Sequence, residues 1–140
     1  NEIHYANNAF NIDSHTPSKL CPDDTVNENF YSRKALISFM SEAEDKGLFP
    51  FIITHHAPCY DRCVQSYFKH DNLSYAYANT GLGDYIDEDF PEFYWVHGHM
   101  HLRKKDVELG KGKMAVNARG YVGYESTHGF SFAEIIIDGY

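Results

Sequence analysis

The chain of 140 residues has few cysteines, no long hydrophobic run and no excess of basic charge. Its three cysteines, Cys21, Cys59 and Cys63, are odd in number and sparse, which argues against a disulfide-stapled secreted domain and predicts free thiols in a reducing compartment. No apolar run approaches the ~20 residues that a membrane-spanning helix needs. No signal-peptide pattern is present either. We therefore expect a cytoplasmic protein with no membrane association.

The charge balance limits the classes of partner. Acidic residues outnumber basic ones by 20 to 12, so the formal net charge is −8. Non-specific binding of nucleic acid needs clustered lysine and arginine, so nucleic acid is expected only as a substrate class. The main basic cluster, Arg103-Lys104-Lys105, is interpreted as a solvated loop, with attraction of an anionic substrate as the alternative.

Periodicity and turn residues predict one α/β domain over residues 1–140, which begins with an irregular lead-in at 1–24. Apolar residues at helical spacing predict a helix over 27–46 that ends at Gly47. The short apolar run 51–54 predicts a strand buried on both faces, and 93–96 predicts a second buried strand. The other expected elements are a helix within 75–86, a hairpin of 106–109 with 113–117, and a last strand at 132–137. This order is consistent with one half of a layered α/β domain.

Two histidine clusters follow the two predicted buried strands. Thr54-His55-His56-Ala57-Pro58 comes after the first strand, and His97-Gly98-His99-Met100-His101 comes after the second. Open α/β sheets bind ligands at the carboxyl ends of their strands. Neutral imidazole is the commonest metal-binding side chain in proteins. A metal site at this edge of the sheet is therefore the leading hypothesis.

The spacing within each cluster suggests which rings face the site. In an extended segment His99 and His101 point the same way. His97 lies before Gly98, where the backbone can turn, so it is expected to point the opposite way and is interpreted as structural. One of His55 and His56 faces the site for the same reason. Three such histidines could complete a mononuclear zinc site, or form half of a two-metal site with carboxylates from elsewhere. A zinc site built from Cys59, Cys63 and a histidine is a weaker alternative.

The two clusters together resemble those of the calcineurin-like metallophosphoesterases. The likeness rests on Thr54-His55-His56-Ala57-Pro58, on Trp95-Val96-His97-Gly98-His99-Met100-His101, and on Val116-Asn117-Ala118-Arg119-Gly120-Tyr121, where many relatives have proline in place of alanine. The resemblance implies the C-terminal half of a four-layer α/β/β/α sandwich. It also implies a binuclear centre of two divalent ions, Mn, Fe, Zn or Mg, and a hydrolase that attacks phosphate mono- or diesters with a metal-bridging hydroxide.

Residue by residue, the resemblance makes three histidines metal ligands. His56 would be one of the metal ligands, His99 would bind one ion, and His101 would bind the other. His55 and His97 would lie behind the ligands or act as additional ones. No residue of this chain is assigned as catalytic by the resemblance. Arg119, Tyr121, Tyr60 and Arg62 follow the motif strands on loops, so they are the candidates for contact with the phosphate-ester substrate.

The family's N-terminal motifs are not visible in this sequence. Asp13-Ser14-His15 imitates Asp-x-His but is interpreted as a turn, and Gly83-Asp84-Tyr85-Ile86-Asp87 imitates Gly-Asp-x-x-Asp but is interpreted as a helix end. The bridging carboxylate would then come from an N-terminal half-domain in the same precursor or in a separate chain. Without it we expect little or no catalysis. The alternatives are a non-catalytic structural or assembly subunit and a mononuclear zinc-binding module that uses His56, His99 and His101.

Overall fold

The computed structural model describes residues 21–66, 69, 74–124 and 135–136. The chain divides into two compact units, residues 1–34 and 35–140, and the second unit contains the sheet. Most of the predicted last strand, 132–137, and the motif Asp13-Ser14-His15 lie outside the described residues. Ile135 and Ile136 are described and belong to no strand. No helix in the described part of the chain is both long and apolar enough to cross a membrane.

Helix α1 (Pro22–Asp45) begins five residues earlier than predicted. Pro22 occupies the first helical position, where its missing N–H costs nothing. The Asp24 carboxylate accepts a hydrogen bond from the Cys21 backbone N–H at 2.8 Å, as in a capping box. The Thr25 hydroxyl donates to the Pro22 carbonyl at 2.7 Å. The lead-in therefore ends before residue 22 rather than at 24.

The end of α1 agrees with the prediction and follows from Gly47. The Gly47 N–H donates to the Glu44 carbonyl at 3.0 Å, and the Leu48 N–H donates to the Ala43 carbonyl at 2.8 Å. This pair of bonds is the Schellman motif, which requires a left-handed residue at the position after the cap. Gly47 supplies it with a φ of 63°. The helix consequently ends at Asp45, five residues before Pro50, and the chain turns into the first strand.

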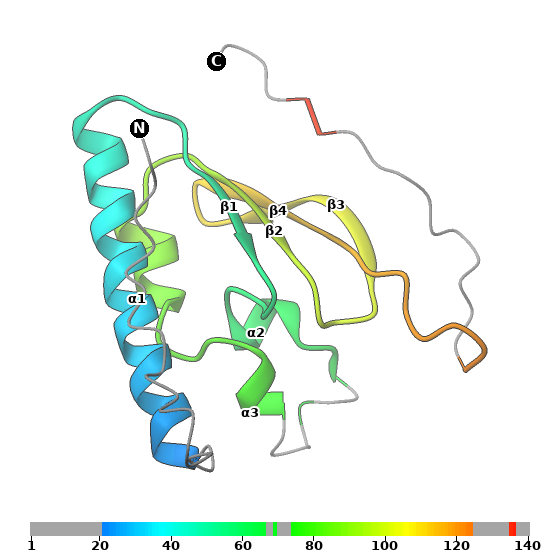
Figure 1. Ribbon diagram of the computed structural model, residues 1–140. Helices are drawn as coiled ribbons and strands as arrows, with labels where there is room; N and C mark the ends of the chain where they lie inside the picture. The colour runs from blue at the N-terminus through cyan, green and yellow to red at the C-terminus, as the bar shows by residue number, and fades with distance from the viewer. Residues whose placement is uncertain (1–20, 67–68, 70–73, 125–134, 137–140) are drawn as a thin grey trace, which may run out of the picture. The chain divides into compact units, whose positions relative to one another are not determined.

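The sheet has four strands in the order β1-β2-β4-β3 (Figure 1). The strands β1 (Phe51–Thr54), β2 (Tyr94–His97) and β4 (Gly112–Asn117) are mutually parallel neighbours. The remaining strand, β3 (Arg103–Leu109), pairs antiparallel with β4 as the predicted hairpin. Helices together with a mixed sheet place the chain in the α/β class, as predicted. The strands at 51–54 and near 93–96 and the hairpin are confirmed.

The main core lies on one face of this sheet. Ile52, Trp95 and Met114 lie side by side in register on neighbouring strands and are buried there. Met40 of α1 belongs to the same cluster, together with Tyr60 and Cys63 of α2 (Tyr60–Cys63) and Ile86 of the π-helix η2 (Tyr85–Asp89). A further short helix, α3 (Ser74–Tyr77), precedes η2 in the chain. The helix predicted within 75–86 is thus divided into α3 and η2.

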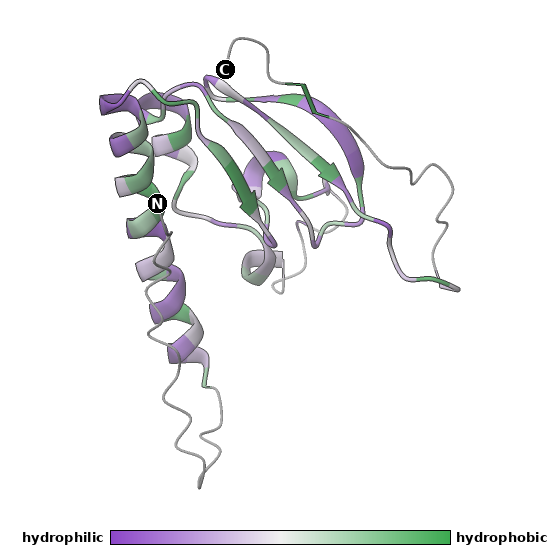
Figure 2. Ribbon diagram, turned by 45° about the horizontal axis from the view of Figure 1, so that its top comes forward, coloured by the Kyte–Doolittle hydropathy of each residue, from purple (hydrophilic) through white to green (hydrophobic). Residues whose placement is uncertain are grey.

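The opposite face of β1 is exposed, so the prediction of a strand buried on both faces is wrong. Phe51 is 41% and Ile53 74% exposed. The cause is the position of β1, which lies at an edge of the sheet and has β2 as its only partner strand among the described residues. Figure 2 shows that β1 is nonetheless largely hydrophobic along its length.

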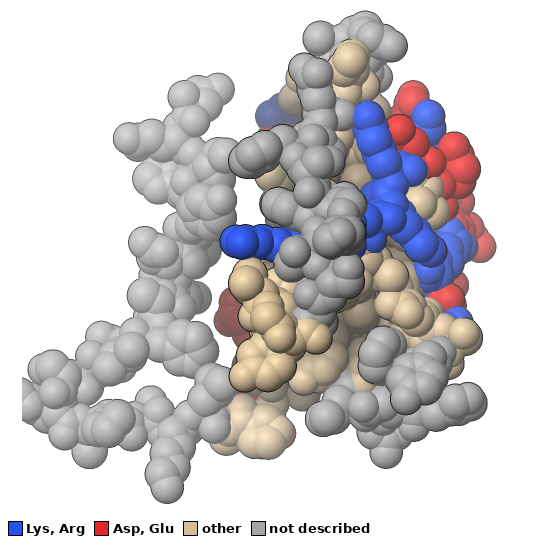
Figure 3. All heavy atoms as spheres, turned by 90° about the vertical axis from the view of Figure 1, so that its right-hand side faces the viewer, with Lys and Arg blue, Asp and Glu red and all other residues tan. Residues whose placement is uncertain are grey.

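The basic cluster Arg103-Lys104-Lys105 lies on strand β3 and not in a loop, so that interpretation is also wrong. All three side chains are exposed, as are Asp106 and Glu108 on the same strand. Figure 3, seen from the side of β3, shows basic side chains next to acidic ones. Charged side chains on an edge strand discourage pairing with other sheets.

Candidate metal centre

The pairing of β1 with β2 brings the two histidine clusters together. Thr54 and His97 are partners in the parallel register, so both strands end at the same edge of the sheet. The Gly98 N–H donates to the His55 carbonyl at 3.0 Å and extends the pairing by one residue. A Cβ added to Gly98 would lie 3.4 Å from His55 Nδ1, so the absence of a side chain lets the His55 ring sit against the backbone.

Three imidazoles form a compact group at this edge. One ring nitrogen each of His55, His56 and His99 lies within 4.8 Å of the others. The ring centroids are 5.2, 5.1 and 5.2 Å apart, and His99 Nδ1 lies 3.2 Å from His55 Nε2. Tetrahedral ligands at a zinc–nitrogen distance of ~2.0–2.1 Å are about 3.4 Å apart. The group could hold a single ion, with its most distant nitrogen atoms moving closer together.

The turn at His99 decides which histidines meet. His99 has a φ of 57°, in the left-handed region that costs a residue with a side chain about 1–2 kcal/mol. The Met100 N–H donates to the Gly98 carbonyl at 2.6 Å, which closes a tight turn around His99. Non-glycine residues in this conformation cluster at functional sites. Because the segment is not extended, the argument that His99 and His101 point the same way does not hold.

His101 lies outside the group. Its ring packs against Tyr121 at a centroid distance of 4.7 Å. Of the three ligands implied by the motifs, His56 and His99 are brought together, and His55 joins them where His101 was expected. A role for His101 in binding a second ion stays a prediction.

His97 is buried beneath the site and is not part of the group. It is 4% exposed, its Nδ1 lies 3.0 Å from the Gly98 carbonyl oxygen, and its Nε2 is buried with no hydrogen-bond partner among the described residues. The register places its side chain on the same face of the sheet as Thr54 and Val116.

Hydrogen bonds on both sides hold the loop that carries His55 and His56. The Trp95 indole N–H donates to Thr54 Oγ1 at 2.8 Å, and the Thr54 hydroxyl donates to the His56 carbonyl at 2.7 Å. On the other side, the Ala57 N–H donates to the Tyr77 carbonyl at 3.1 Å. Supports of this kind orient ligands in metal sites.

Replacing Thr54 with valine is expected to lower zinc affinity by about 10-fold, because the carbonyl next to the His56 ring loses its anchor and the Trp95 N–H loses its acceptor. A competition titration with a chromophoric chelator measures the change. Thr54→Ser, which keeps the hydroxyl, should bind zinc nearly as the parent chain does. Equal affinities of the valine variant and the parent would refute the anchoring role.

Tyr77 is a site residue that the sequence did not reveal. Its ring stacks on His99 at 4.1 Å with an interplanar angle of 30°, and it also lies 6.1 Å from the His56 ring. Tyr77 comes from α3, 22 positions before His99 in the sequence, and no motif marks it. The stacking covers one face of the His99 ring and restricts its rotation.

Electrostatics favour the metal-binding form of two of the rings. Burial lowers the pKa of His56, and the charge of His55 lowers it further. Burial likewise lowers the pKa of His99, with smaller effects from the charges of His56, His55 and His101. A lowered pKa keeps these imidazoles neutral at pH 7, and a neutral ring is what a metal ion requires.

The four substrate candidates do not converge. The Tyr60 hydroxyl donates to the Lys69 carbonyl at 2.9 Å, and Arg62 forms an ion pair with Asp87. Arg119 is exposed, and its carbonyl accepts a hydrogen bond from Arg103 at 3.2 Å. Of these four residues, Tyr121 has a ring contact with one of the motif histidines, His101.

Two further sequence motifs do not join the histidine group. The segment from Gly83 to Asp87 begins a helical stretch that leads into η2, so its interpretation as a helix end is wrong. Among the described residues, no group of metal-binding side chains combines Cys59 and Cys63 with a histidine. In the same part of the chain, no carboxylate joins the three histidines.

Comparisons with protein-family models, with curated proteins and with solved structures found no match for this chain. The resemblance to calcineurin-like metallophosphoesterases therefore rests on the motifs.

Proposed function

We propose that this chain binds a divalent metal ion at His55, His56 and His99 and contributes this site to the hydrolysis of phosphate esters. The observation that carries the proposal is the convergence of the three imidazoles at the carboxyl ends of two adjacent parallel strands. Imidazole ligands suit Zn, Fe and Mn better than Mg. A divalent ion held there supplies Lewis acidity toward a phosphate oxygen.

The residues around the group have distinct roles in this proposal. His55, His56 and His99 hold the ion, and Tyr77 fixes the orientation of the His99 ring. Tyr121 and the nearby Arg119 are proposed to contact the phosphate ester, since an arginine fork matches the geometry of phosphate oxygens. Tyr60 and Arg62 are not assigned to the substrate, because their polar groups are bound within the chain.

The missing carboxylates are proposed to come from an N-terminal half-domain, in the same precursor or in a separate chain. On this proposal the sheet is one of the two central layers of an α/β/β/α sandwich, and His101 serves a second ion. The exposed apolar side chains Phe51 and Ile53 support it, because they leave an apolar sheet face that another layer would cover.

The first test is binding of inorganic phosphate to the zinc-loaded and manganese-loaded chain by calorimetry. Slow hydrolysis of an aryl phosphate is measured alongside. We expect phosphate to bind only when metal is present, and we expect neither binding nor hydrolysis in the His99→Ala variant. A metal-loaded chain with neither phosphate affinity nor hydrolysis would contradict the proposal.

A second candidate function is a mononuclear zinc-binding module without catalysis. Two observations favour it. Three imidazoles suffice to hold one zinc ion, and among the described residues no carboxylate joins the group. One tightly bound zinc per chain, with no phosphate affinity in the experiment above, would support this module instead.

A further inference from the structure

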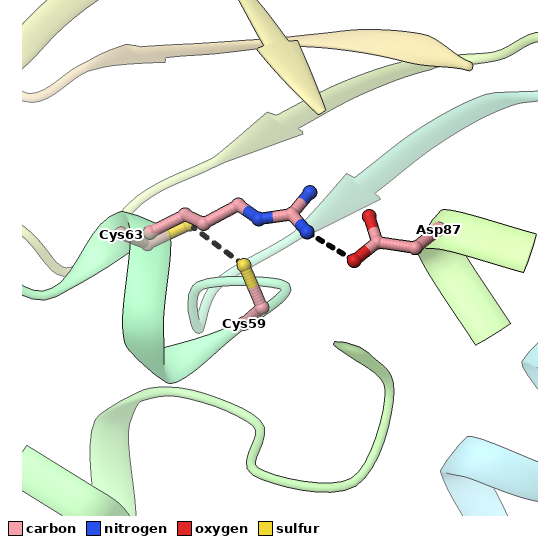
Figure 4. Close-up of polar contacts among 4 residues, drawn as sticks. Cys59, Cys63 and Asp87 are labelled. Atoms are coloured by element: carbon pink, nitrogen blue, oxygen red, sulfur yellow. Dashed lines mark hydrogen bonds and ion pairs between the residues drawn. The ribbon is translucent and has the colours of Figure 1, made fainter. Parts of the chain in front are cut away.

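Two cysteines at the ends of α2 form a close thiol pair. Cys59 caps the helix and Cys63 is its last residue, and their sulfur atoms are 3.7 Å apart. Neither is in a disulfide, and they are 5% and 4% exposed. Figure 4 shows the two side chains pointing toward each other. A disulfide has an S–S length of ~2.05 Å, so closing the bond requires a movement of about 1.7 Å.

The two thiols are not equivalent. The hydrogen bond from Cys63 lowers the pKa of Cys59, with a smaller effect in the same direction from Arg62, while burial opposes both. The same hydrogen bond and burial raise the pKa of Cys63. The Cys63 sulfur also lies 3.5 Å from the Met114 sulfur in the core. Cys59 is thus the more acidic thiol of the pair, and Cys63 is the thiol that faces the core.

The two cysteines are almost equally buried but differ in their position relative to a surface hollow. Cys59 lines a hollow of about 250 Å³, together with Tyr60, Asp61 and Tyr75, whereas Cys63 does not line it. A water molecule takes up ~30 Å³ in the liquid, so the hollow is large enough to admit a small hydroperoxide. Thiolate character combined with access is what makes a cysteine susceptible to oxidation.

We propose that Cys59 and Cys63 form a reversible disulfide site, in which a hydroperoxide oxidises Cys59 and Cys63 resolves the product. In the first step the Cys59 thiolate attacks the peroxide, its O–O bond breaks, and Cys59 sulfenic acid and an alkoxide or hydroxide are formed. In the second step the Cys63 sulfur attacks the Cys59 sulfur, the S–O bond breaks, and water leaves with the Cys63 proton. A dithiol reductant reduces the disulfide back to two thiols by thiol–disulfide exchange and is itself oxidised.

The site does not depend on the proposed metal function. The disulfide needs only the two sulfur atoms, and no third metal-binding side chain joins them among the described residues. Oxidation in the presence of EDTA therefore tests this inference by itself, and its result is unaffected if the histidine group binds no metal.

The experiment uses the chain with Cys21→Ser, which removes the exposed third thiol. The protein is treated with hydrogen peroxide in EDTA, alkylated and digested with trypsin. Cleavage after Arg62 separates the two cysteines, so an internal disulfide joins the peptides 47–62 and 63–69 into one reducible species. We expect this species to account for both thiols, in a chain whose intact mass is that of a monomer.

Two further variants test the polarity of the pair. With Cys63→Ser, Cys59 should accumulate sulfenic acid that a dimedone probe traps, whereas with Cys59→Ser, Cys63 should stay unmodified over the same time. Free alkylatable thiols after peroxide treatment would overturn the proposal, as would sulfinic acid at Cys59 beside a free Cys63. The peptide result in the Cys21→Ser chain decides the matter even if the other two variants fail to fold.

Discussion

Replacing His99 with alanine is expected to lower the affinity of the chain for zinc by at least about 100-fold. Loss of supporting residues behind a ligand already costs ~10–100-fold in metal affinity, and removal of a ligand costs more. His99 is the one member of the group that comes from the β2 side, so without it two imidazoles from a single loop remain. A competition titration against a chromophoric chelator measures the change.

His101→Ala is the matched control, because it removes the same side chain two residues away. His101 lies outside the group and packs on Tyr121, so its loss should change the affinity for the first zinc ion by less than about threefold. His55→Ala should resemble His99→Ala. If the His101 variant lost zinc while the His55 variant retained it, the ligand set implied by the motifs would be right and the group described above wrong.

Replacing Gly110 with alanine is expected to lower the free energy of unfolding by about 4 kcal/mol, the largest effect of any exchange for alanine proposed for this chain. Gly110 lies in the turn between β3 and β4 with a φ of 57°. A Cβ at this position would lie 2.0 Å from the Ile86 carbonyl oxygen, a backbone atom of η2 that cannot rotate away. The hairpin or η2 would have to shift, and both contribute to the core.

Gly47→Ala separates the clash from the cost of the backbone conformation. Gly47 has nearly the same φ, 63°, but a Cβ there would meet nothing within 4 Å. Only the left-handed conformation is then penalised, and we expect a loss of about 1 kcal/mol. Urea unfolding of both variants measures the difference. Similar losses of stability at the two glycines would show that the clash between the added Cβ and the Ile86 carbonyl oxygen costs nothing.

Much of the sheet could be predicted because its signals are local. Strand β1 was predicted at its observed bounds from a short apolar run between Pro50 and the first histidines. The hairpin followed from alternating residues around a glycine-rich turn. The start of α1 was missed because the capping pair begins with cysteine, which is not a preferred cap residue.

The exposed face of β1 could not be predicted, because an apolar run does not reveal whether its strand lies at an edge of the sheet. The position of β1 depends on which strand pairs beside it, and that is a property of the whole fold. Ile53 is accordingly apolar and largely exposed.

The sequence predicts the edge of the sheet where the histidines gather, but only partly which of them meet. Parallel strand ends bring the two clusters together, and this much follows from the sequence. The choice between His55 and His101 depends on the φ of His99, which rotates the chain out of the extended form and cannot be read from residue spacing. Tyr77 was missed because its contact with His99 arises from the packing of α3, far away in the sequence.

The most direct test of the central claim is X-ray absorption spectroscopy at the zinc absorption edge. The sample is the chain loaded with one equivalent of zinc. The account predicts three imidazole nitrogens at ~2.0–2.1 Å, with the outer-ring scattering typical of histidine, and loss of one of them in the His99→Ala variant. Sulfur scatterers at ~2.3 Å would place the ion at Cys59 and Cys63, and fewer than three imidazoles would leave the histidine group without its ion. Either result would contradict the account.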